Sequence, residues 1–355
     1  MGRPGKLRAA ARLFDCYCVG KLRKMLLLIA LVLAIAFVLI IPIASFRPPT
    51  AETLNSLPWG LISVVLIAAI ALVSFWVFTH VDDGDELKVL ELTAVSSGHT
   101  HSCGLSVDGT VACWGAKFSG QSNPPEGNFS SVSAGGAHTC GVRTDGTIEC
   151  WGSDNSRQSN SPEGTFTSVS AGGEFTCSLG ADGTAECWGL TLEGRVSPPE
   201  GTFASVSSGH VHTCGLRTDG SIECWGVNDD LQADPPDGDF SSVSAGFSNT
   251  CALRIDGTVE CWGSNLDGQS EPPGGAFVSV SSGRSYACGI RTDGTVECWG
   301  AILLGPADAP NGTFLSISTG RDHTCGLRED STVECWGGNE RGQADPRGAT
   351  LGSGR

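Results

Sequence analysis

The sequence predicts an all-β fold, a seven-bladed β-propeller with about three strands per blade, preceded by two transmembrane α-helices. Three features carry this prediction: a strict 37-residue repeat, a hairpin turn at one place in every repeat, and two uncharged runs near the N-terminus. The composition agrees, because 49 Gly and 9 Trp with only 22 Lys plus Arg among 355 residues indicate many tight turns and little helix.

Cysteines define the repeat. One series runs from Cys103 to Cys325 and a second from Cys113 to Cys335, both at intervals of 37 residues, and every cysteine of the second series precedes Trp-Gly. Fourteen of the 16 cysteines and seven of the nine tryptophans are therefore repeat positions. Such self-similarity is typical of repeat architectures, in which each unit buries its faces against its neighbours.

The unit at residues 166–189 illustrates the expected strands. We expect strands at about 166–171, 175–179 and 184–188. The Asp182-Gly183 step predicts a hairpin turn between the last two, since Gly accepts a positive φ without steric cost. The Pro-containing stretch that follows is expected to be a loop.

Regular ends favour a closed ring over an open solenoid. The first unit, from Leu92, and the last, from Phe314, are as regular as the middle ones, whereas an open solenoid needs atypical capping units. Seven units also lie within the usual range of propeller blades. Counting from Leu92 gives seven complete units by Thr350, so we expect no strand to be borrowed across the closure.

The region before the repeats carries a different signal. Residues 25–45 and 59–79 are two runs of 21 residues without charge, long enough to cross the hydrocarbon core as helices. A cleaved signal peptide is the alternative for the first run, disfavoured by its length and by the poor cleavage site at its end. The predicted organisation is a basic flank (1–24), transmembrane helices (25–45 and 59–79) joined by a short loop (46–58), an acidic linker (80–91), the propeller (92–351) and a tail (352–355).

Hairpin geometry predicts that the two cysteines of each repeat are paired. A three-residue loop at 107–109 places Ser106 opposite Thr110 and therefore Cys103 opposite Cys113, where Cα atoms about 4.5 Å apart suit a disulfide. A two-residue loop would put them on opposite faces. Buried thiols are one alternative and a metal site another, although Cys-x9-Cys lacks zinc spacing. The predicted disulfides are Cys103–Cys113, Cys140–Cys150, Cys177–Cys187, Cys214–Cys224, Cys251–Cys261, Cys288–Cys298 and Cys325–Cys335.

Charge and cysteine usage give opposite predictions for the side of the membrane. The first 24 residues carry seven basic side chains against one acid, a net +6 that leaves the rest of the chain at −22. A cytosolic basic flank and two helices would return the propeller to the cytosol. Disulfides instead need an oxidising compartment, and translation from Met25 would leave Arg47 as the main determinant and reverse the topology. We favour the non-cytosolic side; Cys16 and Cys18 in the flank are candidates for acylation.

The repeat motifs resemble those of a known family. A Ser-Val-Ser-Ala-Gly strand, a His-Thr-Cys-Gly strand, an Asp-Gly-Thr turn and a Trp-Gly end recur over about 260 residues. They are similar to the repeats of the regulator-of-chromosome-condensation family, in the compact bacterial version that includes a propeller-type β-lactamase inhibitor protein. The resemblance implies a propeller fold, and for function it implies a range from nucleotide-exchange factors to enzyme inhibitors and surface proteins.

The sequence predicts no enzyme activity, cofactor or metal. No nucleotide-binding glycine loop, zinc-helix motif or Gly-x-Ser-x-Gly elbow is present. The acidic body also argues against nucleic acid as a partner. Histidines at one repeat position are expected to be buried hydrogen-bond donors at strand ends; they are His101, His138, His212 and His323.

Function is expected where the repeats differ from one another. The segment after each Trp-Gly and the short turn before each His-Thr-Cys strand vary, and variation on a rigid scaffold is typical of binding surfaces. The candidate hot-spot residues are Phe118, Phe175, His210, Phe247 and Tyr286. The sequence thus predicts a membrane-anchored, non-catalytic module that binds an unidentified protein partner. The alternatives are a cytosolic-facing regulator of a small GTPase or other enzyme, and a glycan-binding surface propeller.

Overall fold

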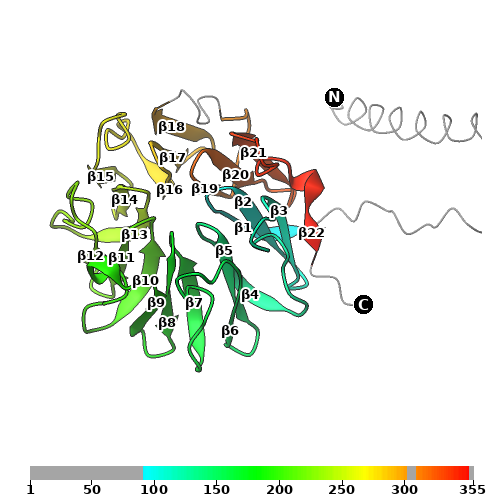
Figure 1. Ribbon diagram of the computed structural model, residues 1–355. Coiled ribbons are helices and arrows are strands. Elements are labelled where there is room, and N and C mark those ends of the chain that lie inside the picture. Colours follow the sequence, from blue (N-terminus) through cyan, green and yellow to red (C-terminus); the bar gives the residue numbers. More distant parts are fainter. Residues whose placement is uncertain (1–90, 302–308, 352–355) are drawn as a thin grey trace, which may run out of the picture. The chain divides into compact units, whose positions relative to one another are not determined.

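Seven antiparallel sheets form a ring around a central channel (Figure 1). The computed structural model describes residues 91–301 and 309–351. Each sheet is one blade, and every blade has three strands except the first, which has a fourth. The ring is closed, since β1 (Leu92–Ser97) of the first blade contacts β19 (Ser316–Thr319) and β20 (His323–Leu327) of the last. The predicted all-β propeller is therefore confirmed.

Every blade repeats one order of strands from the channel outwards. The other inner strands are β4 (Phe129–Ala134), β7 (Phe166–Ala171), β10 (Phe203–Ser208), β13 (Phe240–Ala245) and β16 (Phe277–Ser282). The other middle strands are β2 (His101–Ser106), β5 (His138–Arg143), β8 (Phe175–Gly180), β11 (His212–Arg217), β14 (Asn249–Arg254) and β17 (Tyr286–Arg291). The outer strands are β3 (Val111–Gly115), β6 (Ile148–Gly152), β9 (Ala185–Gly189), β12 (Ile222–Gly226), β15 (Val259–Gly263), β18 (Val296–Gly300) and β21 (Val333–Gly337). Two short 3-10 turns, η2 (Leu192–Gly194) and η3 (Pro346–Gly348), lie between blades or after the last one.

The predicted transmembrane helices, residues 25–45 and 59–79, lie outside the described residues, as do the flank and the tail. Within the described ranges, no helix combines the length and the apolar character that crossing a bilayer requires. The membrane anchor therefore stays a prediction from the sequence.

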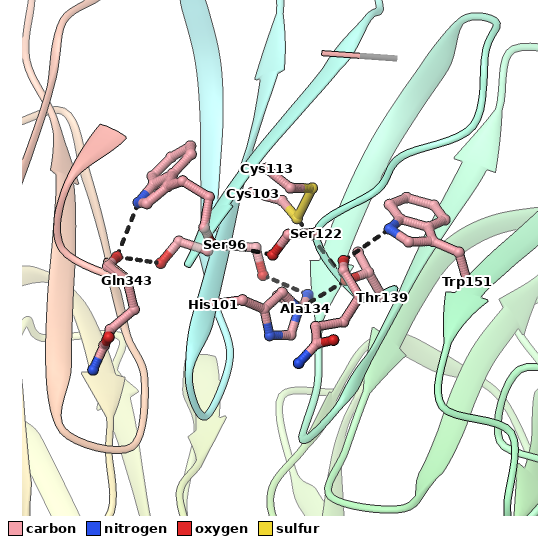
Figure 2. Close-up of a disulfide and its surroundings, with 12 residues drawn as sticks. Ser96, His101, Cys103, Cys113, Ser122, Ala134, Thr139, Trp151 and Gln343 are labelled. Carbon is pink, nitrogen blue, oxygen red and sulfur yellow. Dashed lines mark hydrogen bonds between the residues drawn. A yellow bond between two sulfur atoms is a disulfide. The ribbon is translucent and has the colours of Figure 1, made fainter. Parts of the chain in front are cut away.

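The hairpin between the middle and outer strands has the predicted three-residue loop. In the first blade, the Ser106 N–H donates to the Thr110 carbonyl at 2.9 Å, and Gly109 adopts a φ of +82°. Cys103 therefore lies opposite Cys113, and the two form a disulfide with Cα atoms 4.0 Å apart (Figure 2). The same register and the same bond recur in the other six blades, which confirms the predicted pairing.

The C-terminal segment adds a strand to the first blade. β22 (Thr350–Leu351) pairs antiparallel with β3, with Thr350 opposite Cys113 and Leu351 opposite Ala112 (Figure 1). The expectation that no strand crosses the closure is therefore wrong. In the earlier units the corresponding residues lead into the next inner strand, whereas here the segment pairs with the open edge of the first blade.

The apolar core lies between blades. At the first junction, Phe129 of the second blade packs with Cys103, Leu105 and Val111 of the first. The Phe129 ring also contacts Trp151 of its own blade, with ring centroids 5.8 Å apart. Burying one such phenylalanine stabilises the fold by about 1.5–3 kcal/mol. Equivalent clusters form around the phenylalanines of the later blades, and the first blade has the buried Leu92 in this place.

A serine on each inner strand joins every blade to the next. The Ser96 Oγ accepts a hydrogen bond from the Ala134 N–H at 2.9 Å (Figure 2). Equivalent bonds of 2.8–3.0 Å occur at all seven junctions, and the one between the Ser97 N–H and the Ser318 Oγ closes the ring. The blades approach each other closely here. A Cβ on Gly98 would lie only 2.4 Å from the carbonyl oxygen of Gly135 in the second blade.

Buried histidines form a second set of bonds between blades. The Nε2 of His101 lies 2.8 Å from the Thr139 Oγ1, which lies 3.0 Å from the Gln121 carbonyl oxygen (Figure 2). Because the carbonyl only accepts, Thr139 donates its one hydroxyl proton to Gln121, and His101 donates through Nε2. Burial lowers the pKa of His101 to about 3, so the ring is neutral. The expectation of buried donors is confirmed for this column of His101, His138, His212 and His323.

The serine bonds give a stability prediction. The variant Ser170→Ala leaves the Ser208 N–H without its acceptor at the junction of the third and fourth blades. We expect the free energy of unfolding to fall by about 1 kcal/mol, because the partly buried Ser208 N–H loses its acceptor. Urea unfolding measures this. The control Ser119→Ala changes an exposed loop serine and should cost less than about 0.5 kcal/mol; equal losses for the two variants would contradict the role of the ring.

The histidine column gives a pH prediction. Burial lowers the pKa of His138 to about 4, below its ordinary value of 6.5. Its stabilising contribution is therefore full above pH 6.5 and is lost as the pH falls towards 4, at about 1.4 kcal/mol per pH unit. His138→Asn, which introduces the residue that Asn249 provides in the fifth blade, should make unfolding less sensitive to acid. Urea unfolding at pH 7 and pH 5 tests this, since the turn carboxylates contribute equally to both proteins; parallel pH dependences would refute it.

Candidate functional site

The two variable stretches of every unit lie together on one face of the ring. The Ala116 N–H donates to the Thr100 carbonyl at 2.9 Å, which ties the segment after Trp-Gly to the turn before the middle strand of the same blade. The same bond recurs in the other six blades at 2.7–3.1 Å. We call this side, made of segments equivalent to 98–100 and 116–123, the loop face. The opposite side carries the Asp-Gly hairpins and is called the turn face.

A buried glutamine shapes most segments of the loop face. Gln121 is 3% exposed; its side-chain oxygen accepts from the Ser119 N–H at 2.9 Å, and its main-chain carbonyl accepts from the Trp151 Nε1 of the next blade at 2.9 Å. The same pair of contacts recurs at Gln158, Gln232, Gln269 and Gln343. The third blade has Arg195 in this place, and among the described residues the buried Trp225 Nε1 finds no hydrogen-bond partner.

Large apolar side chains protrude from alternate segments of the loop face. Phe118, Leu192 and Leu266 hold equivalent positions in the first, third and fifth blades and are 78%, 61% and 93% exposed. Side chains this exposed contribute little to the core. Several of them on one face offer apolar contacts to a partner protein. We call these three residues the apolar rim.

Five side chains gather at the mouth of the central channel on the loop face. Each stands directly after the glycine that follows an inner strand, and they are His99, His210, Phe247, Arg284 and Arg321. The His210 and Phe247 rings stack with centroids 3.9 Å apart, and the His99 ring lies 4.8 Å from His210. The Arg284 guanidinium lies 5.5 Å from the Phe247 centroid. We call these five residues the axial cluster.

Glycine at the same position of the third blade makes room for the axial cluster. A Cβ on Gly173 would lie 2.6 Å from the His210 Nδ1 and 2.4 Å from the His210 carbonyl oxygen. The missing side chain therefore leaves the space in which the imidazole of the fourth blade extends towards His99 of the first. The second blade also has glycine here, Gly136.

Electrostatics divide the axial cluster into neutral rings and permanent cations. Burial, with the charges of the neighbouring arginines, lowers the pKa of His99 to about 3 and that of His210 to about 4. Both imidazoles are therefore neutral at physiological pH. The positive charge comes from Arg284 and Arg321, and the Nε of Arg321 lies 3.3 Å from the Asp322 carboxylate.

The structure separates the five residues predicted as hot spots. Phe118 is exposed on the apolar rim, and His210 and Phe247 stack in the axial cluster. Phe175 and Tyr286 are 0% and 4% exposed, because they begin middle strands in the column that holds histidine elsewhere. Their prediction as surface residues is wrong, since that column points into the core between blades.

Three members of the axial cluster are absent from the residues predicted by sequence. His99, Arg284 and Arg321 stand in the variable turns, but their importance depends on what the ring brings beside them. The available signal is the alignment of the units, because these residues lie at multiples of 37 from His210 and Phe247.

Sequence comparison identifies the repeat. The family described as "Regulator of chromosome condensation (RCC1) repeat" matches residues 92–121, 129–158, 240–269 and 314–343. These ranges begin at inner strands and end at the loop-face segments of the first, second, fifth and seventh blades. No match was found among curated protein sequences.

Solved structures share the propeller fold. The CRINKLY WD40 ectodomain of the Arabidopsis thaliana receptor kinase ACR4 is 26% identical, with a TM-score of 0.60 over 69% of this chain and 97% of that one. The entire ectodomain of the Physcomitrella patens receptor kinase CR4 is 24% identical, with a TM-score of 0.61 over 69% and 73% of the two chains. Human WBSCR16 is 15% identical, with a TM-score of 0.58 over 67% and 87%. The last two show similarity of fold alone.

Proposed function

We propose, since this chain carries repeats of the regulator of chromosome condensation family, that it is a membrane-anchored, non-catalytic module whose loop face binds another protein. The observation that carries the proposal is the meeting of both variable stretches on that one face, fixed in each blade by a backbone hydrogen bond. The turn face, by contrast, repeats one hairpin. A surface that differs from blade to blade on a uniform ring provides specific contacts without changing the fold.

The apolar rim and the axial cluster provide the contacts of such an interface. Interfaces concentrate binding energy in a few aromatic, apolar and arginine residues surrounded by contacts that exclude water. Phe118 and Leu266 on the rim, and Phe247 with Arg284 at the mouth, are residues of these types. The repeated histidines are used elsewhere, because they are buried and hydrogen-bonded between blades.

We propose further that the propeller lies on the non-cytosolic side of the membrane. Seven disulfides support this, because such bonds persist in oxidising compartments. One similar solved propeller, the one that is 26% identical, is an ectodomain of a receptor kinase, which agrees with this placement. The basic flank at 1–24 favours the opposite side, and a test therefore has to measure topology directly.

Matched variants on the two faces test the protein-binding function. Phe118→Asp with Leu266→Asp places two charges on the apolar rim, and Val107→Asp with Ile255→Asp places two on the turn face of the same two blades, where the native side chains are 67% and 71% exposed. After crosslinking in membranes, we expect the rim variant to recover its partner at least about tenfold less, as for loss of a hot spot, and the turn-face variant to recover it as the wild type does. Equal recovery from both variants, or glycan binding with no protein partner, would contradict the proposal.

Accessibility of thiols and of the propeller tests the topology. Protein taken from cells with a blocking reagent present should keep all fourteen repeat cysteines unalkylated until reduction, since they are paired. Protease added to intact cells should remove the propeller and leave a membrane-embedded fragment. If the thiols react at once in denaturant and the propeller survives protease, the propeller is cytosolic, and a regulator of a cytosolic enzyme becomes the better proposal.

A further inference from the structure

We infer that the axial cluster is a carboxylate site, in which Arg284 and Arg321 receive an acidic side chain of the partner protein at the centre of the loop face. The inference rests on the proposed function, because it names the chemistry by which that face recognises its partner. The two guanidiniums come from neighbouring blades, the sixth and the seventh, and lie at one mouth with the stacked rings of His210 and Phe247.

The three rings line the same mouth as the two arginines. His99, His210 and Phe247 meet across the axis with ring centroids 3.9–6.3 Å apart. Their backbones are fixed, since the His210 N–H and the Phe247 N–H each donate to a glycine carbonyl of the next blade at 3.0 Å. An arginine that contacts rigid aromatic rings loses part of its hydration, and its guanidinium is held in one orientation. Both effects favour a planar partner that accepts two hydrogen bonds, such as a carboxylate.

The cations of the axial cluster are not fully paired within the described part of the chain. Arg321 lies 3.3 Å from Asp322, but both side chains remain about a third exposed, at 40% and 32%. Arg284 is exposed, and among the described residues its guanidinium lies over the face of Phe247 and not beside a carboxylate. A carboxylate from outside the chain can therefore reach the mouth from solvent, in addition to Asp322. Its charge-assisted hydrogen bonds to the two guanidiniums would be stronger than the bonds that these groups make to water.

Charge around the mouth favours a single carboxylate over a polyanion. The outer segments of the loop face carry exposed acids, namely Asp154, Glu193, Asp229, Asp267 and Glu340. A nucleic acid or a polyphosphate surface would bring charge against these residues as well as against the arginines. One acidic side chain in an otherwise apolar partner surface meets the cations at the centre and the apolar rim around them.

A labelled peptide measures this on the full chain in detergent. The probe is a rhodamine-labelled peptide with blocked ends and one glutamate among alanines, with the glutamine version as its neutral counterpart, and binding is followed by anisotropy at low ionic strength. The double variant Arg284→Gln/Arg321→Gln should weaken binding of the glutamate peptide at least about tenfold. The control Arg157→Gln/Arg347→Gln removes the same net charge from exposed arginines outside the mouth and should stay within about twofold of the wild type.

Each other result overturns the inference. If the wild type binds the glutamate peptide no more tightly than the glutamine peptide, or if both double variants weaken binding equally, the cluster is not a carboxylate site. If inorganic phosphate or glutarate displaces the peptide at equal concentration, the mouth binds a free small anion rather than a side chain. If the Arg284→Gln/Arg321→Gln protein still recovers its partner while the apolar-rim variant does not, the protein-binding function stands and the carboxylate site is wrong.

Discussion

The hydrogen bond from an inner-strand N–H to the serine of the preceding blade is the interaction on which the ring depends. It occurs at all seven junctions with nearly the same length, as does a backbone bond from the start of each inner strand to the hairpin turn of the preceding blade. The other side-chain bonds between blades have exceptions. Within residues 91–301 and 309–351, the histidine bond is absent where Phe175 replaces histidine, and the buried amide of Asn249 makes no hydrogen bond. In the same ranges, the tryptophan bond is absent at Trp225. A closed ring tolerates such gaps because its neighbours on both sides hold each blade in place.

The disulfides act at a different level from the ring. Each bridge closes a hairpin of about 11 residues within one blade, worth roughly 2.5–3 kcal/mol in the chain-entropy model. None joins two blades. Because a three-stranded unit of this size buries too little surface to be stable alone, the bridges stabilise the unit while the serine bonds and the buried phenylalanines stabilise the assembly.

The fold could be predicted from the sequence, including the register of the hairpin strands. The residues of the binding site could be predicted only in part. The Asp-Gly step determined a three-residue loop, and that loop alone determined that Cys103 faces Cys113. The pairing of β22 could not be read in this way, because it depends on where the ends of the ring meet. Phe175 and Tyr286 were predicted at the surface for a related reason. Both residues begin middle strands, and a side chain at that position packs between blades, whereas residues earlier in the turn face the solvent.

The axial cluster shows why residue type is a weaker guide than column position in a ring. His99 and Phe247 are separated by four repeats in the sequence, yet their ring centroids lie 6.3 Å apart, because every blade brings the same position to the axis. The glycine of the third blade is part of this arrangement although it has no side chain, since a Cβ there would collide with His210. A substitution in one blade of such a ring therefore changes the surroundings of residues in several others. For that reason the binding properties of the mouth depend on all residues of this column. The glycine leaves space, the aromatic rings occupy that space, and the arginines supply the positive charge.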